Sequence, residues 1–293
     1  MHEIRAKLWV RNGDNARSLV HVYRAAQFCG TTFDLDHHLI QLAWSHQSPK
    51  SILTRLLRRT RILPLITLRN IKADFDPHMD EEKTAAMMEA ALTIILTTLG
   101  VTKLIGKETP QTQLKKEVVC LLAVSERGHA ELMENIPGLA DVAEYDVGNF
   151  SLKITDLDAV LNDVATFLPG RRKDQGKYKL NNAGWELYDP IFSLHRTTLL
   201  RDMENAKMNY VAHKQDDEKE STQNQIYGIP FPPLPSDVCE EYYRQYRILR
   251  SSHLHSILFV ILWKYYDGPH SAISDRALSY VLVLLNWAME EQS

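Results

Sequence analysis

The sequence predicts a mainly α-helical protein, a helical scaffold with an embedded winged helix-turn-helix domain whose wing is a small β-hairpin. Apolar residues recur at helical spacing along most of the 293 residues, whereas strand-like alternation is confined to the middle of the chain. There, helical patterns come before strand patterns, which is the element order of a winged helix. The predicted parts are an amino-terminal helical scaffold (1–110), the winged-helix domain (111–190) and a carboxy-terminal helical segment (191–293).

The first two helices of the predicted winged-helix domain follow from periodicity and stop signals. Residues 114–124 place Leu114, Val118, Leu121 and Leu122 on one face, with charged residues between them. Residues 129–136 form a short second helix, because Pro137 and Gly138 cannot continue it.

The third helix and the wing are expected further along. Residues 150–154 alternate as a strand does, and Thr155 or Asp156 can cap a third helix that extends through Phe167. The polar residues 171–176 then form a turn, and two short strands at 177–180 and 185–188 are expected around Asn181-Asn182.

The predicted third helix argues against DNA reading. It carries Asp156, Asp158 and Asp163 and has no lysine or arginine, so it would repel phosphates. The basic residues nearby are in the wing, where the partner-surface candidates are Arg171, Arg172 and Lys173, supported by Lys177 and Lys179. Two interpretations stay open for them: solvated loop charges, or a contact with an acidic protein or a nucleic acid.

Composition places the chain among ordinary globular proteins. Apolar residues make up 44% and charged residues 24%, and the net charge of −3 predicts no general attraction to nucleic acid or to an anionic membrane. The three cysteines are far apart and indicate neither a disulfide framework nor a zinc site. No secretory leader pattern follows the first residues, so the expected compartment is the cytoplasm, with the nucleus as a second one.

The amino-terminal scaffold is predicted from a series of helical patterns. Residues 34–44 form a helix with Leu35, Leu39, Leu42 and Ala43 directed inward. Residues 51–60 form a basic helix with Arg55, Arg58 and Arg59, and Arg61 follows it. This basic stretch is either a solvated face or a surface for membranes or acidic partners. A long helix begins after Asp80 and ends at Gly100. Its apolar stretch is too short to cross a membrane, so it is expected to be buried.

The carboxy-terminal segment combines helices with an irregular connection. One long helix is expected over 191–213, followed by a polar, mobile loop at 215–225. The proline-rich residues 230–235 are interpreted as an extended strap, with an SH3 ligand as the alternative. Helices are then expected over 236–250, 252–266 and 274–290.

No catalytic motif is present in the sequence. Phosphate-binding glycine loops, nucleophile elbows and paired metal-ligand motifs are all missing. The histidine pairs His37-His38 and His253/His255 lack the spacing of a helical zinc site, and Cys29 and Cys120 are interpreted as buried structural thiols. We therefore expect no catalytic, cofactor-binding or metal-binding residues.

Motifs in a fixed order carry a resemblance to a known family. In the first part of the chain they are residues 9–13 (Trp-Val-Arg-Asn-Gly), Arg17-Ser18, Tyr23-Arg24 and residues 36–42. They continue with residues 114–122, 129–132, 176–180 and 188–191. In this order the chain resembles the helical scaffold and winged-helix region of the UBR-box ubiquitin ligases, the large N-recognins of the N-degron pathway.

The resemblance implies a role within an E3 ubiquitin ligase much longer than this chain. In that family a zinc-bearing UBR box reads destabilising amino-terminal residues, and a RING domain recruits a RAD6-class ubiquitin-conjugating enzyme. Zinc is expected only in those regions, which three scattered cysteines cannot build. The implied partners are the remainder of the same ligase chain and, indirectly, the conjugating enzyme and N-degron substrates, with no nucleic acid and no membrane.

Three functional hypotheses follow. The leading one is a non-catalytic scaffold that positions substrate recognition relative to the RING. The second is a winged-helix module that binds nucleic acid through its basic wing. The third is an enzyme of a kind that these motifs do not reveal, which a deep polar pocket with convergent titratable groups would indicate.

Overall fold

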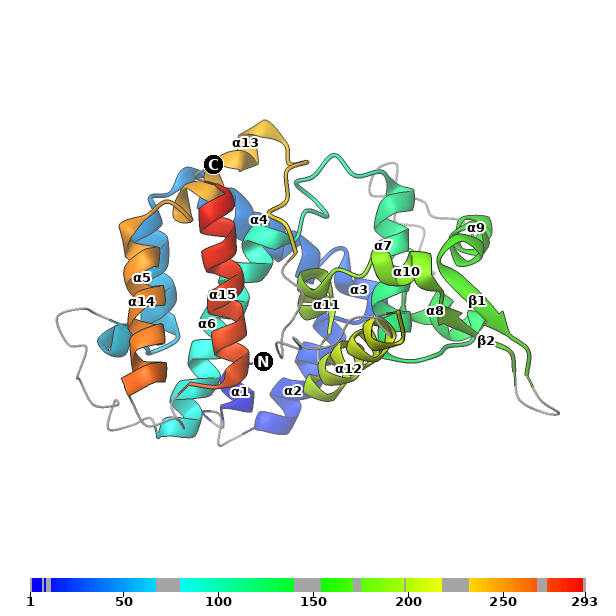
Figure 1. Cartoon of the computed structure of the whole chain (residues 1–293), viewed down its shortest axis with the longest axis horizontal. Coiled ribbons are helices and arrows are strands. Elements are labelled where there is room, and N and C mark those ends of the chain that lie inside the picture. Colours follow the sequence, from blue (N-terminus) through cyan, green and yellow to red (C-terminus); the bar gives the residue numbers. More distant parts are fainter. Residues whose placement is uncertain are drawn as a thin grey trace. The chain divides into compact units, whose positions relative to one another are not determined.

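The structure, a computed structural model, describes most of the chain as helices (Figure 1). The described residues are 2–6, 8, 12–66, 80–139, 154–170, 175–197, 199–217, 232–267 and 273–291. Within them the only sheet is a two-stranded antiparallel pair, so the predicted mainly α fold is confirmed. No described helix is long and apolar enough to span a membrane.

The chain divides into two compact units, which cut it differently from the three predicted ranges. The helical unit comprises Met1–Val20, His37–Gly106 and Phe231–Ser293, and the winged-helix unit comprises His21–Asp36 and Lys107–Pro230. The helices α2 (Gly13–Tyr23) and α4 (Phe33–His46) contribute residues to both.

The helical unit is organised around α6 (Glu81–Gly100), which packs against α15 (Asp275–Glu290). Asp80 begins α6 as predicted, because its Oδ1 accepts a 2.8 Å hydrogen bond from the Lys83 amide. Most of α6 is buried, so the buried-helix prediction is confirmed. The other elements of this unit are α1 (His2–Arg5), α5 (Pro49–Arg59), η1 (Leu63–Ile66), α13 (Glu240–Tyr243), η3 (Arg244–Ile248) and α14 (Ser252–Asp267).

The orientation predicted for α4 is wrong. Leu39 is 54% exposed and Leu35 and Leu42 are exposed as well, whereas Gln41 is 1% exposed. Gln41 is turned inward because its amide donates to the carbonyls of Thr98 (2.9 Å) and Val101 (2.7 Å) at the end of α6. These backbone acceptors, which the sequence pattern does not show, set which face of α4 is buried.

The winged-helix unit contains the predicted first helices α7 (Pro110–Val124) and α8 (His129–Asn135), and then α9 (Ile154–Val164). Its core joins these helices to the hairpin and to the carboxy-terminal helices. The remaining elements are α3 (Ala26–Cys29), β1 (Ala165–Leu168), β2 (Lys177–Leu180), α10 (Asn182–Glu186), α11 (Pro190–Arg196) and α12 (Leu200–Asp217).

The wing is a hairpin, but its strands differ from those predicted. The third helix ends at Val164 rather than at Phe167, and the next four residues form β1, which pairs with β2. Arg127 adds a one-residue bridge to Tyr178 in β2. The predicted second strand at 185–188 is wrong, because Asn181 Oδ1 accepts from the Gly184 amide at 2.8 Å and begins α10 instead.

The carboxy-terminal segment also departs from prediction in one place. The expected helix over 191–213 is two helices, because α11 ends with Thr197 in an extended conformation. The strap interpretation is confirmed for the described residues of the proline-rich segment: Trp287 Nε1 donates to the Pro232 carbonyl at 2.7 Å, and Glu290 accepts from the Leu234 amide.

Several predictions lie outside the described residues. They include the strand at 150–153, most of the loop at 215–225, the Trp9 motif and the wing candidates Arg171, Arg172 and Lys173.

Candidate functional site

The strongest concentration of charged contacts lies within the winged-helix unit, around Arg196 in the last turn of α11. The helix α11 begins at Asp189, whose Oδ1 accepts from the amides of Ile191 (2.8 Å) and Phe192 (3.0 Å), and Pro190 occupies the first position. This cap fixes the start of a helix only seven residues long. The position of Arg196 follows from it.

Two buried carboxylates hold the Arg196 guanidinium. Nε lies 3.0 Å from both oxygens of Glu117, and Nη2 lies 2.6 Å from Glu117 Oε1. Asp34 accepts from Nη1 at 2.6 Å and from Nη2 at 2.9 Å. The three side chains come from α11, α7 and the first turn of α4, so one cation joins three helices.

We define Asp34, Glu117 and Arg196 as the ionic junction. Burial and the mutual charges of these groups determine its electrostatics. Burial alone lowers the pKa of an arginine, but the charges of Glu117 and Asp34 outweigh it and hold the pKa of Arg196 well above its usual value. The guanidinium is therefore a permanent cation, and it does not serve as an acid or a base.

Aromatic and sulfur groups surround the ionic junction. The His195 ring lies 4.6 Å from the Phe33 ring centroid, and its Nε2 is 3.7 Å from Asp34 Oδ1. The Arg24 guanidinium lies over the Phe33 ring, 4.2 Å from its centroid, and donates to the His195 carbonyl. The Cys29 sulfur is 2.9 Å from Arg196 Nη1.

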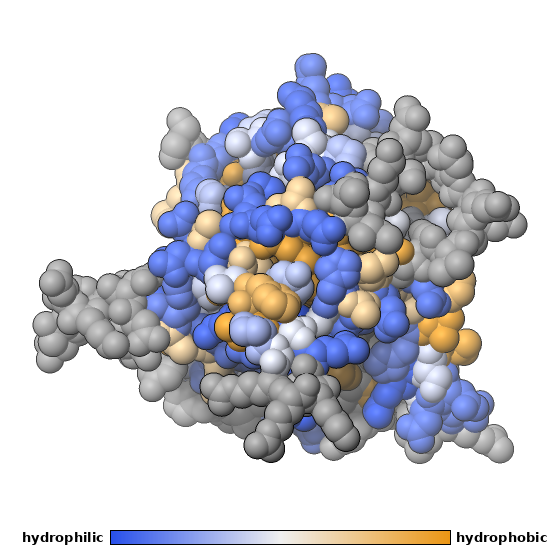
Figure 2. All heavy atoms as spheres, turned by 90° about the vertical axis from the view of Figure 1, so that its right-hand side faces the viewer, coloured by the Kyte–Doolittle hydropathy of each residue, from blue (hydrophilic) through white to orange (hydrophobic). Residues whose placement is uncertain are grey.

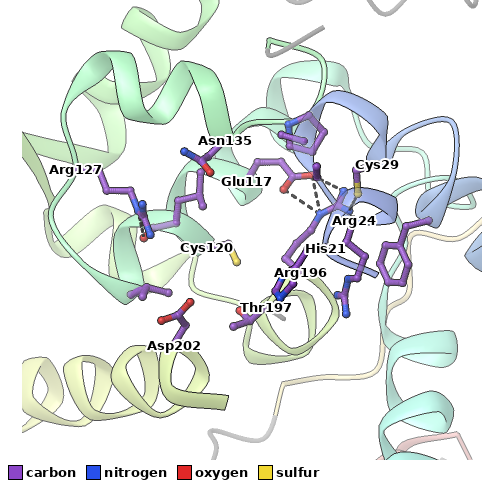
Figure 3. A pocket seen from close by; sticks show the side chains of 16 residues that line it. His21, Arg24, Cys29, Glu117, Cys120, Arg127, Asn135, Arg196, Thr197 and Asp202 are labelled. Atoms are coloured by element: carbon purple, nitrogen blue, oxygen red, sulfur yellow. Dashed lines mark hydrogen bonds and ion pairs between the residues drawn. The ribbon is translucent and has the colours of Figure 1, made fainter. Parts of the chain in front are cut away.

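A cavity of about 290 Å³ opens beside the ionic junction (Figure 3). Arg24, Arg127 and Arg196 contribute to its lining together with Glu117 and Cys120. Figure 3 shows Glu117 and Arg196 pointing toward each other at one end of the cavity, with Arg127 at the other. Arg127 is itself paired with Glu131.

The cavity does not contain an activated nucleophile. Burial raises the pKa of the Cys120 thiol to about 12, and the charge of Glu117 adds to the rise. Arg196 is saturated by carboxylates, and no group of three metal-binding side chains occurs among the described residues. The arrangement can hold helices together, and nothing in it has the geometry of a nucleophile with its base.

The residues of the ionic junction were not predicted as a site from the sequence. Asp34 was interpreted as an ordinary helix start, and Arg196 as part of a longer helix. Glu117 gave a signal, because it lies three residues after Leu114 and four before Leu121, on the apolar face of the predicted helix. In the structure it is 5% exposed. A carboxylate on a buried helical face requires a cation, although the pattern cannot show which one.

The acidic residues of α9 are engaged with neighbours in the same unit. Asp158 lies 3.0 Å from His129, and Asp163 is paired with Lys115 on α7. The described part of α9 has no lysine or arginine. Figure 2 views the molecule from the side of α9 and the hairpin, where hydrophilic residues surround a small hydrophobic cluster. The acidic character predicted for this helix is therefore present in the structure.

Comparisons with known proteins agree with this architecture. Residues 113–222 match the family described as E3 ubiquitin-protein ligase UBR1-like, winged-helix domain. The chain is 27% identical to human E3 ubiquitin-protein ligase UBR3 over 99% of its own length and 15% of that protein. It is 24% identical to fission yeast (Schizosaccharomyces pombe) ubr1 over 97% of its length and 14% of that protein. It is 23% identical to Arabidopsis thaliana PRT6 over 71% of its length and 9% of that protein.

The chain thus spans about a seventh of the curated relatives that it matches along nearly its whole length. The domain match begins within α7 and includes α8 to α12. The match to the winged-helix family, the order of its helices and hairpin, and the similarity along the rest of the chain lead to one conclusion. Residues 113–222 contain the winged-helix domain described for UBR1-like E3 ubiquitin-protein ligases, and the chain is similar along nearly its whole length to a segment of UBR-family E3 ubiquitin ligases.

Proposed function

We propose that this chain is a non-catalytic scaffold segment of a RING-type E3 ubiquitin ligase, which positions N-degron recognition relative to the RING and its conjugating enzyme. The observation that carries the proposal is the orientation of α4, whose exposed face is the one that the sequence predicts to be buried. Its leucines Leu35, Leu39 and Leu42 are exposed, while Gln41 is buried by hydrogen bonds. A contiguous apolar stripe that faces solvent is typical of a surface that packs against another part of an assembly.

A second helix supports the same interpretation. The helix α2 has no buried residue, and its apolar residues Leu19 and Val22 are exposed. We infer that the stripes on α2 and α4 contact the remainder of the ligase chain. The parent ligase then acts with a RAD6-class conjugating enzyme on N-degron substrates in the cytoplasm, with the nucleus as a second compartment.

The ionic junction supports a mechanical role. Each polar group of Arg196 is directed at a buried carboxylate or the Cys29 sulfur, so the site stabilises one arrangement of α7, α11 and the first turn of α4 within the winged-helix unit. A scaffold needs such a fixed arrangement, because its role is to hold other domains in relative position rather than to catalyse a reaction. The chain itself is expected to bind no zinc and to transfer no ubiquitin.

Co-purification with the remainder of the ligase tests this proposal. We would express the chain separately from the other parts of the ligase, combine them, and determine stoichiometry by light scattering. A one-to-one complex is expected. The variant Leu39→Glu/Leu42→Glu should weaken it at least about tenfold, because two charges would enter an apolar interface.

The matched control is Met208→Glu/Leu200→Glu, which changes two exposed apolar residues on α12. It should retain the complex. Circular dichroism of each variant establishes that the helices are intact. A folded, monomeric wild-type chain that does not associate with the remainder would contradict the scaffold proposal.

A further inference from the structure

A second unpartnered surface lies in the helical unit, on α5. Its side chains Lys50, Arg55, Arg58 and Arg59 are exposed, as is Arg61 just after the helix, and α5 contains no acidic residue. Among the described residues, none of these five cations forms an ion pair, and Arg55 makes one hydrogen bond, to Gln47 (3.2 Å). We define them as the α5 cations.

The clustering of these cations is unfavourable within the isolated unit. Arg55, Arg58 and Arg59 are three and four residues apart, so they share one side of the helix and repel each other. The carboxyl end of the α5 dipole offsets this for Arg58 and Arg59 in the last turn, but it does little for Arg55. By contrast, the partly exposed Lys115 on α7 is paired with the carboxylate of Asp163.

The backbone at Arg61 adds an independent indication. Arg61 has a φ of 59°, in the left-handed region that glycine usually occupies at the end of a helix. Its amide donates to the Arg58 carbonyl, and the next amide, of Ile62, donates to Leu57. Helix termination here does not need a charged side chain, and an arginine destabilises the conformation relative to glycine. A strained position that bears a fifth cation points to a role for the charge.

An exposed aromatic stripe follows the outer face of α14. Phe259 is 53% exposed, Trp263 is exposed and Tyr266 is 86% exposed, at helical spacings of four and three residues. The opposite face of α14 is buried through Leu258 and Ile261. Arginine, tryptophan and tyrosine are the side chains most enriched at the energetic centres of protein interfaces.

The two stripes lie on neighbouring helices. The helices α5 and α14 pack against each other and lie side by side in Figure 1. We propose that α5 and α14 together form a docking surface for an acidic amphipathic segment of a partner protein. Its carboxylates would pair with the α5 cations and its apolar residues would cover the α14 aromatics.

The structure disfavours the other acidic partners. Membrane insertion of α5 needs an exposed apolar helix face, but Ile52, Leu53 and Leu57 are buried and Leu56 is partly buried. Single-stranded nucleic acid binds to cations with stacked aromatics, but it needs a cationic track along its backbone. Here the four arginines lie within about two helical turns, and the aromatic stripe ends at the exposed Asp267. Cations over so short a distance, beside an aromatic stripe, fit a short acidic amphipathic polypeptide better than a long phosphate backbone.

A binding experiment with a defined probe tests the proposal. The probe is a labelled amphipathic peptide of about 18 residues, or five helical turns, with glutamates on one face and leucines on the other. Its binding to the full chain is followed by fluorescence anisotropy at increasing salt. We expect saturable binding that weakens with salt, and no binding of the same peptide with lysines in place of glutamates.

Three variants separate this role from stability. Arg55→Gln/Arg59→Gln should weaken probe binding at least about tenfold, and Tyr266→Ser by about threefold or more. Arg61→Gly should weaken binding while raising the thermal midpoint, because it relieves the backbone and removes a charge. The control Arg201→Gln/Lys214→Gln removes two exposed cations from α12 and should change affinity less than about twofold.

Two results would overturn the proposal. The first is the absence of saturable probe binding, or its retention in Arg55→Gln/Arg59→Gln. The second is tighter, charge-dependent binding of a single-stranded oligonucleotide of about 20 nucleotides or of phosphatidylserine vesicles, which would assign the surface to nucleic acid or to membrane.

Discussion

Arg196 on α11 and Glu117 on α7 form a buried ion pair with Nη2 and Oε1 2.6 Å apart. The contact fixes a carboxy-terminal helix of the winged-helix unit to the unit's first long helix. Asp34 shares the same guanidinium from the first turn of α4. Stability of this unit therefore depends on one side chain that satisfies two carboxylates.

Replacing Arg196 with methionine should destabilise the chain strongly. The substitution keeps much of the apolar stem but leaves Asp34 and Glu117 buried without their cation. We expect a loss of about 3–5 kcal/mol in the free energy of unfolding, measured by urea denaturation. Arg201→Met, at an exposed position on α12, should change it by less than about 0.5 kcal/mol.

The triple variant Arg196→Met/Asp34→Asn/Glu117→Gln separates charge from packing. Because it removes the uncompensated charges together with the cation, it should recover part of the stability that Arg196→Met loses. A triple variant as unstable as the sum of its single variants would show that the three groups act independently.

The contrast between α6 and this ion pair shows what local pattern determines. The bounds of α6 could be predicted because Asp80 and Gly100 lie at its two ends and its apolar residues are contiguous. Arg196 and Glu117 are 79 positions apart in the chain, so their pairing depends on tertiary packing. The wing illustrates the same limit: β2 was expected from its own residues, but its partner β1 was interpreted as the end of a helix.

Which face of α4 is buried could not be predicted from the sequence, for a related reason. The leucine spacing of α4 predicts an inward stripe, yet Gln41 is turned inward because two carbonyls at the end of α6 need a donor. Acceptors that belong to another element outweighed the apolar pattern.

Asp189 should make stability depend on pH. Burial raises the pKa of its carboxyl, although hydrogen bonds from Phe192 and Ile191 and the charge of Lys116 oppose the rise. A raised pKa in the folded state contributes stability that is fully present below the unfolded value near 3.8 and is lost as pH rises through the folded value. Asp189→Asn keeps an oxygen acceptor for the cap and removes this loss.

The expected result is a comparison across pH. The stability gained by Asp189→Asn over the wild type should be larger at pH 7 than at pH 3.5, as measured by thermal unfolding of both proteins at both pH values. Asp189→Ala, which removes the cap as well as the charge, should be about 1 kcal/mol less stable than Asp189→Asn at both pH values. If the stability difference between Asp189→Asn and the wild type did not change with pH, burial of the Asp189 carboxylate would not be its cause.

The cysteines should differ in reactivity. Cys29 and Cys120 are buried and Cys239 is partly exposed. Because burial raises the Cys120 pKa to about 12, its thiolate is scarce at pH 8. Titration of the folded chain with a disulfide reagent should modify Cys239 first, and mass spectrometry should locate the label. All three thiols should react in guanidinium chloride; rapid labelling of Cys120 in the folded chain would contradict its burial.

Gly184 in α10 is a position where a single methyl group should destabilise the winged-helix unit. A Cβ atom there would lie 2.3 Å from the Val164 carbonyl oxygen and 2.8 Å from Leu180 Cδ2. The first of these is backbone at the end of α9, which cannot move without shifting β1. Gly184→Ala should therefore reduce the free energy of unfolding by about 1–3 kcal/mol.

Gly30→Ala is the matched control for Gly184→Ala. It has φ −63° and ψ −37°, and a Cβ atom there would meet nothing within 4 Å. Gly30→Ala should leave stability unchanged or raise it by about 0.4–1 kcal/mol, because alanine restricts the unfolded chain. Urea denaturation of both variants measures the difference. If Gly184→Ala were as stable as Gly30→Ala, the close approach of α10 to the end of α9 would be wrong.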